Sequence, residues 1–114
     1  MDIDKFISDY IAAALWSSID DNDEPLDSNY SIDDISEECL LKMKIDCKKF
    51  VLDNIGILTE SDHPGHDFWL TRNGHGAGFW DGDYPIHGNT LTTSSVDYGP
   101  TDLYVGDDGL IYCT

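Results

Sequence analysis

Apolar residues recur at helical spacing in two segments of the first half of the chain. In residues 3–17 they follow the i, i+3, i+4, i+7 pattern of one helix face: Phe6, Ile7, Tyr10, Ile11, Ala14 and Leu15. A second, longer helix is expected to begin after Ser36 and to end around residues 55–58. Its apolar face comprises Leu40, Met43, Cys47, Phe50, Val51 and Leu58. Residues 31–34 between them predict one short helical turn.

Aromatic and β-branched runs in the second half predict two β-hairpins. In residues 66–81, two aromatic-rich runs flank the pair Asn73-Gly74, a strong signal for a tight turn because both residues tolerate positive φ. We expect strands near 67–72 and 77–81. A second hairpin is predicted with strands at 102–105 and 110–113, around an Asp-Gly connection.

The stretch 89–98 is dominated by Thr and Ser. It predicts a short helix from about Thr90 to Tyr98, with Leu91 and Val96 toward the core.

These elements predict an α+β fold in which two N-terminal helices pack on a small antiparallel sheet of three or four strands. A chain of 114 residues is long enough for a single domain with its own core. It divides into an acidic helical part, 1–58, and a hairpin-rich part, 66–114. The side chains of Phe68, Trp69, Phe79 and Trp80 are expected to anchor the core.

Charge is the most unusual property of the composition. The chain has 23 acids against 6 bases, a formal net charge of −17. Such a field repels nucleic acid and anionic membranes and attracts a basic protein surface. It also exceeds the magnitude of roughly 2–8 that keeps a small domain soluble. Residues 18–38 contain nine acids and no base. The nine acids are Asp20, Asp21, Asp23, Glu24, Asp27, Asp33, Asp34, Glu37 and Glu38.

A calcium loop does not explain these acids. In a twelve-residue calcium loop beginning at Asp20, Pro25 occupies the position that needs glycine, and Ser31 the position that needs a bidentate glutamate. The histidine pair His63 and His66 lacks the ligand spacing of a zinc site. We therefore expect no metal and no cofactor.

A second polar group lies in the first predicted hairpin: His66, Asp67, Arg72, Asn73 and His75. A histidine oriented by Asp67 and assisted by Arg72 is a conceivable general acid or base. The same side chains can equally brace the turn by bonding one another. No nucleophile elbow accompanies them, and the glycines at 74–78 precede no helix N-terminus that would bind phosphate.

Three cysteines do not indicate a disulfide framework. Cys39 and Cys47 are eight residues apart on a predicted helix, so their Cα atoms lie about 12 Å apart. That separation exceeds the roughly 7 Å limit for a disulfide. Both are expected to be buried as small apolar side chains.

The segments 14–18, 24–30, 66–81 and 103–109 together resemble a family of small acidic proteins of bacteriophages and other mobile elements, with no firmly assigned activity. The resemblance implies a phage context. By analogy it implies an inhibitor of host defence, anti-CRISPR or anti-restriction, that mimics the charge of DNA and occupies a basic groove of a nucleic-acid-binding effector.

Two hypotheses follow. In the first, the protein is not an enzyme, and its acidic residues at 20–38 bind a basic surface of a host effector. In the second, it is a small enzyme with its site at 66–81. The start Met-Asp-Ile-Asp lacks the basic residues of a secretory signal, and no apolar run approaches the roughly 18–20 residues that span a bilayer. A cytoplasmic location, in the host cell if the protein is phage-encoded, is therefore expected.

Overall fold

Four α-helices and one sheet of two strands form the part of the chain that the computed structural model describes, residues 2–58, 63–74, 78–79 and 84–114. The helices are α1 (Ile3–Ser17), α2 (Glu37–Asp53), α3 (Pro64–Arg72) and α4 (Gly88–Val96). The strands are β1 (Leu103–Val105) and β2 (Ile111–Cys113), and two short 3-10 helices are η1 (Leu26–Ser28) and η2 (Ile32–Asp34). The described fold is mostly helical, so the predicted sheet of three or four strands is wrong.

The helices predicted from periodicity are confirmed. Asp2 caps α1 by accepting a hydrogen bond from the Lys5 amide at 3.1 Å, and Ser36 caps α2 by accepting one from Cys39 at 3.2 Å. Helix α2 ends at Asp53, earlier than expected. The reason is Asn54, whose side-chain amide donates to the Phe50 carbonyl at 2.9 Å and so terminates the helix.

The prediction of the first hairpin is wrong, because the segment predicted as the strand 67–72 lies in helix α3. Pro64 occupies the first turn of this helix, where its missing N–H costs nothing. Asn73 is the C-cap, and Gly74 follows it at φ +76°. Asn-Gly here terminates a helix in the left-handed conformation and does not turn a hairpin. The predicted partner strand, 77–81, lies largely outside the described residues.

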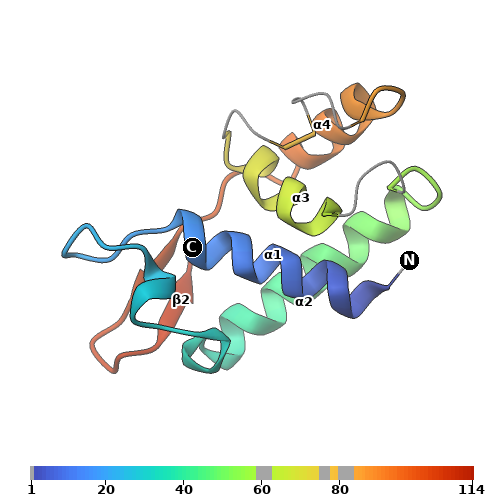
Figure 1. Cartoon of the computed structure of the whole chain (residues 1–114). Coiled ribbons are helices and arrows are strands. Elements are labelled where there is room, and N and C mark those ends of the chain that lie inside the picture. The colour runs from blue at the N-terminus through green and yellow to red at the C-terminus, as the bar shows by residue number, and fades with distance from the viewer. Residues whose placement is uncertain (1, 59–62, 75–77, 80–83) are drawn as a thin grey trace.

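Helix α1 packs against both α3 and α2, and α4 covers the other side of α3 (Figure 1). The core between them is aromatic, with the rings of Phe50 and Phe68 stacked at 4.0 Å between centroids. Phe68, Trp69 and Phe79 are buried as predicted, and Trp80 lies outside the described residues. Gly65 brings α3 onto α1, since a Cβ there would lie 2.1 Å from the carbonyl oxygen of Phe6.

The short helix predicted near 90–98 is confirmed as α4, two residues earlier than expected. Leu91 is buried, whereas Val96 is half exposed and its predicted place in the core is wrong. The C-terminal hairpin is also confirmed: Leu103 pairs with Cys113 and Val105 with Ile111 in an antiparallel register.

The β1–β2 hairpin lies at the end of the molecule where α1 ends and α2 begins (Figure 1). It is attached there by a parallel bridge between Ile35 and Ile111 and by a hydrogen bond from the Ser36 amide to the Ile111 carbonyl at 2.8 Å. Among the described helices, none has the length and apolar character needed to cross a membrane.

Candidate functional site

Arg72, at the end of α3, is buried in the interior of the protein. Its Nη1 donates to Asp46 Oδ2 on α2 at 2.9 Å and to the Tyr10 hydroxyl on α1 at 3.1 Å. Its Nε and Nη2 donate to the carbonyl oxygens of Gly99 and Tyr98, at 2.9 and 3.1 Å. One guanidinium thus connects four segments of the chain.

The surroundings of Arg72 keep it charged. Burial lowers the pKa of Arg72, but Tyr10 and Asp46 together raise it by more. The net shift of its pKa is therefore upward. The guanidinium carbon also lies 5.7 Å from the centre of the Phe68 ring and 5.6 Å from that of Tyr98. An arginine whose donors point into carbonyls, a carboxylate and a hydroxyl of the fold is a structural group.

Asp67 and His66 point to two other parts of the molecule. Asp67 Oδ2 accepts a hydrogen bond from the Tyr84 hydroxyl at 2.9 Å, and its Oδ1 lies 3.5 Å from His66 Nδ1. The His66 ring faces Trp16 of α1, with centroids 6.1 Å apart. Asp67 is buried and His66 is half-buried, so the Asp67 carboxylate bonds mainly to groups in the interior.

Asn73 fastens the C-terminal segment to α3. Its Oδ1 accepts from the Thr101 amide at 2.8 Å, and its Nδ2 donates to the Trp69 carbonyl at 3.0 Å. Trp69 Nε1 in turn donates to Ser17 Oγ at 2.7 Å. A cavity of about 410 Å³ opens between these groups and the segment 100–103.

The polar residues predicted from the sequence make defined contacts within the fold, but they do not form one site. His66, Asp67, Arg72 and Asn73 each contact a different part of the fold, and His75 lies outside the described residues. In the described part of the chain no three His, Cys, Asp or Glu side chains are grouped so as to hold a metal ion.

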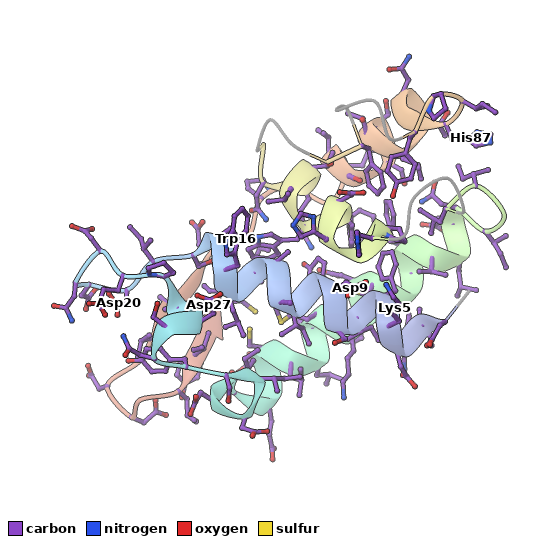
Figure 2. The ribbon with its side chains drawn as sticks, in the orientation of Figure 1. Lys5, Asp9, Trp16, Asp20, Asp27 and His87 are labelled. Atoms are coloured by element: carbon purple, nitrogen blue, oxygen red, sulfur yellow. The ribbon has the colours of Figure 1, made fainter. Side chains whose placement is uncertain are left out.

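The nine acids predicted to bind a partner gather at one end of the molecule. They lie on the loop after α1, on η1 and η2, and on the first turn of α2 (Figure 1). Asp20 and Asp27 are both at this end, whereas His87 marks the opposite end (Figure 2). Of the nine, Asp20 and Asp34 are half-buried and the other seven are exposed.

Three of these acids also shape the loops that carry them. Asp20 Oδ1 accepts from the amides of Asn22 and Glu24, at 2.8 and 3.1 Å. Glu24 accepts from the Asn29 side chain at 2.8 Å, and Asp34 accepts from the Ser31 amide at 2.8 Å. These neutral donors fix the loops and leave the negative charges in place.

The β1–β2 turn adds two acids that the sequence did not connect with the other nine. The bridge between Ile35 and Ile111 places Asp107 and Asp108 beside η2. A hydrogen bond from the Tyr112 hydroxyl, with a second from the Leu110 amide, lowers the pKa of Asp108. The hairpin itself was predictable, but its attachment beside residue 35 had no local signal. We call these eleven residues the acidic end.

Lysine and arginine do not neutralise the acidic end. Between described residues, ion pairs join Lys5 to Asp9, His66 to Asp67 and Arg72 to Asp46, all outside the acidic end. Four of the six bases, Lys42, Lys44, Lys48 and Lys49, lie further along α2. Lys42, one helical turn after Glu38, lines a cavity with it, but no ion pair joins the two described side chains.

No family model matches the chain, and no curated protein or solved structure is significantly similar to it.

Proposed function

We propose that the protein binds, through its acidic end, a basic nucleic-acid-binding surface of another protein. The observation that carries this proposal is the concentration of eleven acids at one end without an ion pair to Lys or Arg in the described structure. Uncompensated like charge destabilises a fold, so its concentration on one surface favours a role in binding.

The charge density supports mimicry of DNA. Eleven of the 23 acids lie at this one end, and duplex DNA, with about one negative charge per 1.7 Å of its axis, is likewise densely negative. A groove that holds DNA through phosphate contacts is a suitable partner for such a surface.

The resemblance to phage proteins gives this binding a context. The proposed partner is a host defence effector that acts on nucleic acid, of the CRISPR or restriction type, and binding excludes its DNA. No catalytic group and no cofactor takes part, and the protein itself binds neither nucleic acid nor membrane.

The test compares two triple variants with equal net charge. The acidic-end variant is Asp21→Asn, Asp27→Asn and Asp33→Asn, and the control variant is Asp4→Asn, Asp53→Asn and Asp97→Asn. All six carboxylates are exposed, so both variants are expected to fold as the parent does. Each is expressed in a host carrying a restriction or a CRISPR system, and the plating efficiency of a sensitive phage is measured.

We expect the parent and the control variant to protect the phage and the acidic-end variant to lose protection. In parallel, the effector captured on immobilised parent at about 50 mM salt is expected to be released by duplex DNA and by about 500 mM salt. Equal protection by both variants, or capture that neither salt nor DNA reverses, would show that charge mimicry is wrong.

A further inference from the structure

Cys39 on α2 and Cys113 on β2 form a pair of thiols at a small cavity. The Cys113 thiol donates a hydrogen bond to the Cys39 carbonyl oxygen, which lies 3.9 Å from its sulfur. Cys39 is buried and Cys113 is half-buried. The cavity has a volume of about 190 Å³, with Ser36, Glu38, Lys42, Tyr104 and Tyr112 as its other lining residues.

The two thiols are electrostatically unequal. The neighbouring Cys39 thiol, aided by the charge of Lys42, lowers the pKa of Cys113 to about 7 in spite of burial. The neighbouring Cys113 thiol, together with burial, raises the pKa of Cys39. Lys42 is held nearby because its ammonium donates to the Thr114 carbonyl. A partly exposed thiolate beside a lysine and a second thiol is the environment of a reactive cysteine.

We propose that Cys113 is a peroxide-reactive thiol and that Cys39 resolves its oxidised form, linking α2 to β2 by a disulfide. The Cys113 thiolate attacks one oxygen of hydrogen peroxide, the O–O bond breaks, and the departing hydroxide is protonated to water. Cys113 is then a sulfenic acid. The sulfur of Cys39 attacks that sulfur, the S–S bond forms, and the S–O bond breaks. The proton of Cys39 leaves with the hydroxide as a second water, so two thiols are oxidised and one peroxide is reduced.

The experiment treats the whole protein with hydrogen peroxide and measures intact mass and linked peptides. We expect the loss of two hydrogens per chain and a single linkage between the Cys39 and Cys113 peptides. Cys47, which is fully buried, is expected to remain alkylatable after unfolding. A mixture of linkages, or no linkage at peroxide levels that leave free cysteine largely reduced, would overturn the proposal.

Single variants separate the two roles. Cys39→Ser is expected to stop at the sulfenic acid, gaining one oxygen that dimedone traps on Cys113, whereas Cys113→Ser gives neither product. Cys47→Ser is the matched control and should form the disulfide as the parent does. Lys42→Gln should slow the peroxide reaction at pH 7 about threefold or more, because less Cys113 is ionised. Equal dimedone labelling of Cys39→Ser and Cys113→Ser would contradict the assignment.

A separate observation concerns the outward face of α2, which carries an exposed apolar stripe. Leu41, Ile45 and Leu52 are 59, 55 and 70% exposed, and Ile55 in the following turn is 73% exposed. With Lys48 in the gap, their spacing alternates between four and three residues, the heptad spacing of a coiled-coil seam. The opposite face of α2 is buried in the core.

The charges beside this stripe specify its partner. Lys44 and Lys49 occupy the heptad positions that flank the seam, where interhelical ion pairs form. A second copy of α2 would oppose lysine with lysine, in a protein that already carries 17 net negative charges. We infer that the stripe binds an amphipathic helix of another protein, with Leu or Ile in its seam and Glu at its flanks.

The probe for this surface is a synthetic helix of three heptads with Leu and Ile in the seam and Glu at both flanks. Its glutamates prevent the peptide from pairing with itself. We expect binding by calorimetry, at least tenfold weaker binding when the flanks are Lys, and the same weakening in the variant Ile45→Gln, Leu52→Gln. Equal binding of both peptides, undiminished binding to the variant, or a dimer of the free protein in sedimentation would overturn the inference.

Discussion

Arg72 on α3 and Asp46 on α2 form an ion pair of 2.9 Å across the core, and the arginine side chain is only 3% exposed. Because Arg72 also donates to Tyr10 and to the carbonyls of Gly99 and Tyr98, the pair joins α1, α2 and α3 to the C-terminal segment.

Removal of the guanidinium should be among the most damaging single changes in this chain. Arg72→Met keeps the length of the side chain but leaves Asp46 and the two carbonyls without their donor. We expect a loss of about 3–5 kcal/mol in the free energy of unfolding, measured by urea denaturation.

The matched control for this change is the exposed pair of Lys5 and Asp9, 2.7 Å apart with the lysine side chain 53% exposed. Asp9→Asn should cost about 0.5 kcal/mol or less, because water screens the pair. Similar losses in the two variants would show that Arg72 does not hold the core together.

The error at residues 66–81 has a physical cause. Eight of the nine residues of α3 are buried, so the helix has no polar face and its sequence shows neither the period of a helix nor that of a strand. The turn signal Asn73-Gly74 is real, but both a hairpin and a helix C-terminus use it. Pro64 was the local sign that a helix begins there.

Segments with one buried face were predicted correctly. Helix α1 alternates a buried and an exposed face, and its bounds of 3–17 match the prediction. The acidic residues were likewise found from composition, because charged side chains remain on the surface. The contact of Cys113 with Cys39 was not predictable, since it depends on where the C-terminal hairpin attaches to α2.

Gly65 should tolerate no side chain, because a Cβ there would lie 2.1 Å from the backbone carbonyl of Phe6. We expect Gly65→Ala to cost about 1–3 kcal/mol by forcing α3 away from α1, and Gly65→Asn to cost more. Thermal denaturation measures both.

Gly56 provides the contrast, because it has open space around it but a φ of +87°. Gly56→Ala should cost about 1 kcal/mol from backbone strain, and Gly56→Asn less, because Asn adopts the left-handed conformation more readily. If Gly65→Asn were more stable than Gly65→Ala, as expected for the two variants at position 56, backbone conformation and not helix contact would explain the glycine at position 65.

Asn73 should behave as a structural residue. Asn73→Ala removes the acceptor of the Thr101 amide and the donor to the Trp69 carbonyl, and we expect a loss of about 1–3 kcal/mol. Hydrogen exchange should show faster exchange of the Thr101 amide. Asn73→Asp keeps the acceptor, so it should retain most of that protection. Unchanged stability and unchanged exchange of the Thr101 amide in Asn73→Ala would contradict a structural role for Asn73.

Alkaline pH should unfold the protein through its buried tyrosines. Burial raises the pKa of Tyr10, and burial with the neighbouring charges of Asp53 and Asp46 raises the pKa of Tyr98 to about 12. An unfolded tyrosine ionises near pH 10.

Since the folded pKa values are the higher ones, the unfolded chain releases protons first as the pH rises. The stability from these groups is therefore complete below about pH 10 and is lost progressively between about pH 10 and 12. Urea denaturation at a series of pH values measures the loss, and tyrosinate absorbance should rise together with unfolding. Tyr98→Phe removes one of the two groups, so its stability should fall less steeply over the same range. A parent protein equally stable at pH 9 and pH 12 would contradict the placement of both hydroxyls in the interior.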